Sequence, residues 1–222
     1  MRVGKTFVAD VLRESAREIE SERRRWKRRK PRVVEPNDVW AMDITGLPDS
    51  NRKSHPVLGI IDHGSRRIVG LHAIETKASL ALLRWLIEAI ERFGKPRALR
   101  TDNEAIFTSR LFRFGLWWMG IRHQRTEKHC PWQNGRIERF FGTLKRHTRQ
   151  MVFDDREAIG KALGIFRIWY ECVRPHQNLA GKTPWEAWNG EDPLNDGIPR
   201  SWRWVEEWDG VLSGFVPEKG GG

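Results

Sequence analysis

Apolar and polar positions along the chain predict strands first and helices afterwards. Three short apolar runs, at 38–45, 57–62 and 67–74, have the length and β-branched content of strands. The second run is almost continuously apolar, which predicts a strand buried on both faces. The short connections predict an antiparallel meander. Residues 79–93 then place apolar side chains at helical spacing, up to a stop at Gly94.

The middle of the chain continues as alternating strands and helices. We expect brief strands at 97–101 and 121–123, and helices at 109–119, 131–150 and 157–170. Three strands, a helix, a strand, a helix, a strand and further helices indicate an α/β fold. Its sheet should be mixed and flanked by helices.

Charge and composition narrow the class of partner. The chain carries 40 Lys and Arg against 29 Asp and Glu, a formal net charge of +11, which favours an anionic partner such as nucleic acid. No apolar run reaches the length of about 18 residues that a membrane-spanning helix needs, so we expect no membrane partner. Two cysteines make no disulfide framework and are typical of a reducing compartment.

Much of the positive charge lies near the N-terminus. Apolar positions at helical spacing predict one basic helix over 5–30, ended by Pro31. Its basic block binds phosphates on one interpretation and is a solvated arm without a specific role on the other. The block includes Arg23, Arg24, Arg25, Lys27, Arg28, Arg29, Lys30 and Arg32.

The C-terminal tail is rich in tryptophan. We expect it to form a strap that packs Trp202, Trp204 and Trp208 against the core. The organisation predicted from the sequence is a basic N-terminal helix and linker, a core, and this tail, over residues 1–35, 36–190 and 191–222.

Three carboxylates are candidates for chemistry. Asp43 lies late in the first strand, Asp102 directly follows the strand at 98–101, and Glu138 lies on a later helix. If strand ends bring them together, they repel one another unless a cation lies between them. Mg²⁺ suits such a site, and two ions would serve phosphodiester chemistry. The alternative is that these are ordinary surface acids, although an isolated charge would be costly after the apolar residues 40–42.

The segments around these carboxylates resemble a known family. Trp40–Thr45, Arg100–Glu104 and Pro131–Phe140 are similar to the three signature segments of the DDE integrase and transposase core, and 35 residues separate Asp102 from Glu138. Residues 173–186 resemble the segment that closes the insertion-sequence members of this family.

The resemblance implies a ribonuclease H-like fold with Asp43, Asp102 and Glu138 as a metal triad that binds Mg²⁺ or Mn²⁺, as two ions. It implies hydrolysis at a DNA end and transfer of the freed 3′-hydroxyl to target DNA. The implied partners are double-stranded DNA, as element ends and target, and further copies of this chain in a homodimer or higher oligomer. The implied location is the bacterial cytoplasm, with the nucleoid.

Several basic and polar residues near Glu138 are candidate DNA contacts. Lys145 lies seven residues further along the helix, on the same face, where the resemblance implies a phosphate contact. Arg136 and Arg139 either grip phosphates or belong to a solvated face. Asn134 begins a turn signal, and we favour a turn role over a DNA contact.

Other residues have weaker assignments. Asp62 ends the second strand, and we expect it to lie outside the triad. Arg174 and His176 are candidate DNA or helix-cap contacts. Gly4–Arg13 resembles the last helix of a helix-turn-helix region, which leaves sequence-specific end binding open. Two alternative functions are a non-catalytic DNA-binding remnant that regulates an intact transposase, and a ribonuclease H-like nuclease that only hydrolyses.

Overall fold

The chain divides into two compact units, Met1–Val33 and Val34–Gly222. The computed structural model describes residues 4–16, 18, 20–22, 34–126, 134–192 and 201–217. None of the helices in these described ranges is long and apolar enough to cross a membrane.

In the first unit, helix α1 (Lys5–Glu14) has an exposed apolar stripe that includes Phe7 and Leu12. The prediction of one continuous helix over 5–30 is wrong at Ser15, where the backbone leaves helical geometry. Serine competes with the helical backbone for hydrogen bonds, which makes it a weak helix former. Helical turns resume at Ala16. The basic block from Arg23 to Arg32 lies outside the described residues.

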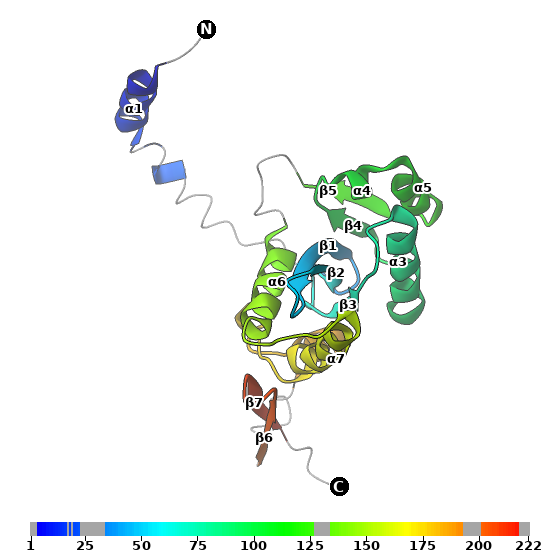
Figure 1. Cartoon of the computed structure of the whole chain (residues 1–222). Coiled ribbons are helices and arrows are strands. Elements are labelled where there is room, and N and C mark those ends of the chain that lie inside the picture. Colours follow the sequence, from blue (N-terminus) through cyan, green and yellow to red (C-terminus); the bar gives the residue numbers. More distant parts are fainter. Residues whose placement is uncertain are drawn as a thin grey trace. The chain divides into compact units, whose positions relative to one another are not determined.

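The second unit is built on a five-stranded mixed sheet in the order β3-β2-β1-β4-β5 (Figure 1). β1, β2 and β3 form an antiparallel meander, whereas β4 pairs parallel with β1, and β5 pairs parallel with β4. The predicted meander, mixed sheet and buried second strand are confirmed. The strands are β1 (Val39–Pro48), β2 (Ser54–Asp62), β3 (Ile68–Ala73), β4 (Ala98–Thr101) and β5 (Arg122–Arg125).

Helices cover both faces of the sheet. α6 (Gly135–Thr148) and α7 (Arg156–Cys172) pack on one face, and α3 (Ser79–Phe93) and α5 (Arg110–Trp118) pack on the other. A short helix that the sequence pattern did not predict, α4 (Ala105–Thr108), precedes α5.

Alternate residues of β1 enter the two hydrophobic cores. Trp40 and Met42 pack with α3 and α5, and Ala41 packs with α6 and α7. Because side chains alternate along a strand, Asp43 lies on the face that α6 covers.

A close contact brings α6 down onto the sheet beside Asp43. Gly59 pairs with Asp43 across β1 and β2. A Cβ atom at Gly59 would lie 2.7 Å from Cζ of Phe141, so only glycine allows this approach. Phe140 and Phe141 fill the space above β2, and this packing fixes the helix that carries Glu138.

The segment after α7 returns to the core. It contains the 3₁₀ helix η2 (Gln177–Leu179) and α8 (Pro184–Asn189), and Thr183 and Glu186 form a complete capping box at the start of α8. The buried Arg67 guanidinium lies 4.4 Å from the centre of the Trp185 ring. This cation–π contact links α8 to the beginning of β3.

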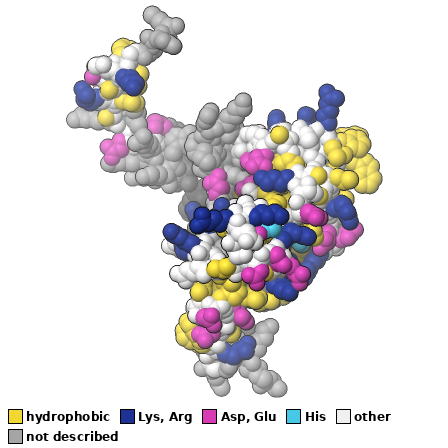
Figure 2. Space-filling view, viewed as in Figure 1, with side chains coloured by type: hydrophobic (Ala, Val, Ile, Leu, Met, Phe, Trp, Pro, Cys, Tyr) yellow, Lys and Arg dark blue, Asp and Glu magenta, His cyan; other side chains and the backbone are white. Residues whose placement is uncertain are grey.

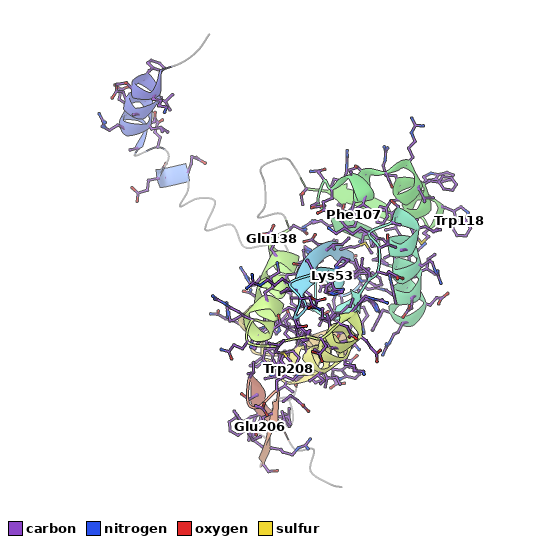
Figure 3. The ribbon with its side chains drawn as sticks, in the orientation of Figure 1. Lys53, Phe107, Trp118, Glu138, Glu206 and Trp208 are labelled. Atoms are coloured by element: carbon purple, nitrogen blue, oxygen red, sulfur yellow. The ribbon has the colours of Figure 1, made fainter. Side chains whose placement is uncertain are left out.

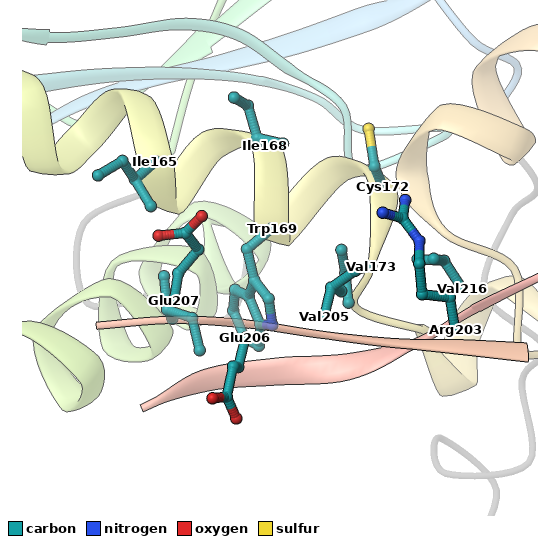
Figure 4. A pocket seen from close by; sticks show the side chains of 11 residues that line it. Ile165, Ile168, Trp169, Cys172, Val173, Arg203, Val205, Glu206, Glu207 and Val216 are labelled. Carbon is teal, nitrogen blue, oxygen red and sulfur yellow. The ribbon is translucent and has the colours of Figure 1, made fainter. Parts of the chain in front are cut away.

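The tail is a β-hairpin of β6 (Trp202–Glu207) and β7 (Leu212–Pro217), packed on α7. Trp208 stacks against Phe166 with the ring centres 6.4 Å apart, so this tryptophan packs against the core as predicted. The prediction is wrong for Trp202 and Trp204, which are 46% and 50% exposed because they lie on the hairpin rather than beneath it. A mostly apolar pocket of about 330 Å³ lies between α7 and the hairpin (Figure 4).

Candidate active site

Asp43 is a half-buried carboxylate in the middle of β1. Its Oδ1 accepts a hydrogen bond from the backbone N–H of Ile44 at 2.7 Å. Burial, together with the negative charges of Asp102, Glu104 and Glu138, raises the pKa of the Asp43 carboxyl to about 7, and the hydrogen bond from Ile44 opposes this shift. Within the part of the chain that the structure describes, three further carboxylates thus contribute negative charge at Asp43.

Asp102 follows β4 directly and comes alongside Asp43 through parallel pairing. Ala41 of β1 lies opposite Arg100 of β4 in this parallel pair. Asp43 and Asp102 each lie two residues further along, so they come at the same level of the sheet. Asp102 Oδ1 accepts a hydrogen bond from the N–H of Glu104 at 2.9 Å, which closes a tight turn.

The same turn contributes two further polar residues. Asn103 Nδ2 donates to the carbonyl oxygen of Thr126 at 2.6 Å, so this side chain ties the turn to the end of β5. Glu104 adds a fourth carboxylate within electrostatic range of Asp43. Sequence reasoning assigned Glu104 no role, although its position two residues after Asp102 was a signal.

Glu138 lies in the first turn of α6 and is exposed (Figure 3). The helix is anchored by the buried side chains of Ile137, Phe140 and Phe141. The structure thus places Asp102 and Glu138 within electrostatic range of Asp43, from the end of β4 and from α6.

These residues fit a divalent cation by their chemistry. Carboxylate oxygens are the donors that Mg²⁺ prefers, and three further carboxylates lie within electrostatic range of Asp43. Among the residues that the structure describes, no three Asp, Glu, His or Cys side chains converge closely enough to form a preassembled ion site. The donor set is therefore right in type, and a bound ion would have to draw the carboxylates together.

The predicted DNA contacts differ in accessibility. Lys145 and Arg139 are exposed on α6. Arg136 is half-buried and donates a hydrogen bond to the carbonyl oxygen of His63. Asn134 is 4% exposed and begins α6, so in this conformation its position agrees better with the turn role than with a DNA contact.

Comparisons with known proteins identify the family. Two profiles, both described as integrase core domain, match residues 33–131 and 119–184. The chain belongs to the integrase core domain family. It is a DDE-type integrase and transposase core, as the resemblance of its three motifs implied.

Relatives in bacterial insertion elements share the core. The chain is 32% identical over 154 residues to the insertion element IS476 uncharacterized 39.2 kDa protein of Xanthomonas euvesicatoria, covering 67% of this chain and 43% of that protein. It is 27% identical to the transposase for insertion sequence element IS904 of Lactococcus lactis, covering 69% of this chain and 62% of the relative. The chain thus spans about half the length of these relatives.

Solved structures agree on the fold. A simian T-cell lymphotropic virus intasome in complex with the PP2A regulatory subunit B56 gamma matches with a TM-score of 0.60 and 18% identity, covering 84% of this chain and 78% of that chain. The HTLV-2 integrase catalytic core domain in complex with magnesium matches with a TM-score of 0.52 and 21% identity, covering 70% of this chain and 99% of that one. The predicted ribonuclease H-like fold is confirmed.

Proposed function

We propose that the chain is the catalytic core of a DNA transposase, a divalent-metal-dependent polynucleotidyl transferase. It hydrolyses DNA ends and joins the resulting 3′-hydroxyl to target DNA. The observation that carries this proposal is the half-buried Asp43, which lies within electrostatic range of Asp102, Glu104 and Glu138 in an integrase core fold.

Each of the three carboxylates has a distinct task. Asp43 is fixed by the sheet and Asp102 by the turn after β4, and both would bind the two metal ions from one side. Glu138 would close the site from α6. Bound there, Mg²⁺ or Mn²⁺, as two ions, would stabilise charge on the phosphate and activate the attacking oxygen.

The substrate in this proposal is double-stranded DNA. Lys145 is exposed on the same helical face as Glu138, and we assign it a backbone phosphate near the cut. The basic block from Arg23 to Lys30 would add contacts that do not depend on sequence. The expected location is the bacterial cytoplasm, with the nucleoid.

Joining two element ends to a target requires two active sites, so we infer a homodimer or a higher oligomer. Light scattering of the chain with DNA should give a mass of at least two copies. A monomer both free and with DNA would contradict this part of the proposal.

The decisive variant is Asp102→Asn. It should abolish Mg²⁺- or Mn²⁺-dependent strand cutting and leave DNA affinity intact or raised, because one negative charge is removed. The matched control is Asp154→Asn, which makes the same change at an exposed position after α6. This control should cut like the wild type.

Two results would separate the alternatives. A wild-type chain that binds DNA but cuts no strand with either ion would favour a non-catalytic regulator. Cutting without joining would favour a nuclease. Loss of DNA binding in Asp102→Asn would mean that Asp102 supports folding, and the assignment of roles would be wrong.

A further inference from the structure

Four arginine side chains gather beside the N-terminal half of α6. Arg66 comes from the turn between β2 and β3, Arg136 and Arg139 from α6, and Arg174 from the segment after α7. Arg66 and Arg136 both donate a hydrogen bond to the carbonyl oxygen of His63. Two guanidinium groups that are distant in sequence therefore converge on one oxygen atom. We call these four residues the arginine cluster.

A buried tyrosine lies against the cluster. The Arg174 guanidinium is 5.6 Å from the centre of the Tyr170 ring, and this ring meets the ring of His176 edge to face at 4.8 Å. Burial raises the pKa of the Tyr170 hydroxyl to about 12, against the opposing charges of Arg174, Arg66 and Arg139. Three members of the cluster are therefore close enough to Tyr170 for their charges to influence its hydroxyl.

The neighbouring histidines, His63 and His176, are neutral near pH 7 and add no positive charge to this cluster. Burial, together with nearby arginines, lowers the pKa of His63 and of His176 to about 3 in each case. Arg174 Nη1 lies 2.9 Å from His176 Nε2, so the neutral ring accepts from the guanidinium.

The described part of the chain supplies little negative charge to this surface. Burial lowers the pKa of Arg66 and of Arg136, and the charge of Asp62 opposes this shift. Asp62 is, however, fully buried, and its two oxygens already accept hydrogen bonds from Ser65 and Asn37. Within residues 34–126, 134–192 and 201–217, no member of the arginine cluster forms an ion pair with a carboxylate.

The cluster also has donors to spare. A guanidinium carries five N–H groups, and the hydrogen bonds of Arg66 and Arg136 to backbone carbonyls use only part of them. Convergent guanidinium groups match the oxygens of a phosphate in charge and in geometry. Lys and Arg side chains are visible over the region of α6 in Figure 2.

We propose that the arginine cluster is an anion site that holds one backbone phosphate of the bound DNA. The identity of the anion rests on the proposed function, whereas the site itself rests on the four side chains. Glu138 and Arg139 are neighbours on α6, so the helix connects the carboxylates to the cluster. A phosphate held there fixes the position of the strand relative to Asp43 and Asp102.

The test compares DNA binding of variants without divalent ions, where no cutting takes place. Arg139→Gln/Arg174→Gln should bind a short duplex at least ~10-fold more weakly at low salt, because charge-assisted hydrogen bonds to phosphate are lost. The slope of log affinity against log salt should fall by about 1 for the lost phosphate contact. Fluorescence anisotropy over a salt series measures both quantities.

Two variants serve as controls. Arg84→Gln removes the same charge from an exposed position on α3, on the other face of the sheet, and should leave affinity and slope unchanged. Arg139→Gln alone changes an exposed side chain and should give a smaller loss of affinity, which keeps the test valid if the double variant does not fold.

The outcomes are distinguishable from failure of the proposed function. Wild-type affinity and slope in both cluster variants would overturn the assignment of the cluster to a DNA phosphate, whatever the cutting assay shows. A free anion is the other source of phosphate oxygens. If inorganic phosphate raises the melting temperature of the wild type but not of the double variant, while duplex affinity is equal in both, the site takes a free anion and the DNA assignment is wrong.

Discussion

Two aspartates on neighbouring strands have opposite surroundings. Asp62, at the end of β2, is fully buried and accepts hydrogen bonds from the N–H and hydroxyl of Ser65 and from the N–H of Asn37. Asp43, in the middle of β1, accepts one backbone hydrogen bond and faces three other carboxylates. Burial raises the pKa of both side chains.

The difference distinguishes an aspartate with a structural role from one that belongs to the proposed active site. The fold supplies donors to Asp62, so this charge holds the turn between β2 and β3 in place. Among the described residues it supplies one donor to Asp43, from Ile44, and places three further carboxylates within electrostatic range, which disfavours the ionised form when no cation is bound. This contrast supports the proposed divalent-ion site at Asp43.

The largest expected effect is on catalysis. Asp43→Asn should reduce strand cutting by more than ~100-fold, since the loss of a direct metal ligand exceeds the loss of an outer-shell partner. Asp62→Asn should cut within a few-fold of the wild type. A gel assay with labelled duplex and Mn²⁺ measures both variants. Equal losses in the two variants would remove the distinction between them.

The next effect concerns stability. Asp62→Ala should lower the free energy of unfolding by about 2–4 kcal/mol, because buried donors at Ser65 and Asn37 lose their acceptor. Asp43→Ala without metal should be neutral or stabilising, because repulsion among the carboxylates is relieved. Denaturant unfolding in EDTA tests the pair, and a stable Asp62→Ala protein would refute the structural role.

A smaller effect follows from pH. The folded-state pKa of Asp43 lies at about 7, above its usual value of 3.8, so the folded state retains a proton that the unfolded state releases. Stability without metal should therefore fall as pH rises between about 4 and 7, by ~1–3 kcal/mol once partial exposure is considered.

Asp43→Asn provides the control for this pH dependence. Its stability should lack this fall, because the amide does not titrate. Mg²⁺ should raise the melting temperature of the wild type more at pH 8 than at pH 5, since it binds the ionised carboxylate. The same pH profile in the wild type and in Asp43→Asn would show that another group is responsible.

The smallest effect tests the reach of the site along α6. Lys145→Ala should weaken duplex binding by roughly 3-fold and lower the salt slope by about 1, because one phosphate contact is lost. Lys161→Ala, at an exposed position on α7, is the matched control and should bind like the wild type. Equal binding by both variants would place Lys145 on a solvated face.

Much of the fold could be predicted because its signals are local. The apolar runs at 57–62 and 79–93 carry the periods of a buried strand and of an amphipathic helix, and both elements formed where expected. The hairpin at the C-terminus was not predictable from its tryptophans, since their apolar character does not say which of them finds a partner.

The site was predictable in part for the same reason. Asp43, Asp102 and Glu138 stand in recognisable segments, but Asp43 and Asp62 both follow apolar strand residues, and only the structure shows which one has donors. The arginine cluster is assembled by tertiary contacts between the β2–β3 turn, α6 and the segment after α7. The sequence named Arg136, Arg139 and Arg174 as candidate DNA contacts one by one, but no spacing along the chain could place them beside Arg66.

The central claim is that Asp43, Asp102 and Glu138 form a divalent-ion site, and anomalous diffraction tests it most directly. Crystals of the full chain with a bound duplex would be soaked in Mn²⁺. The account predicts anomalous density among the three carboxylates in the wild type and none in Asp102→Asn. Absence of density there in the wild type, with DNA bound and Mn²⁺ in excess, would contradict it.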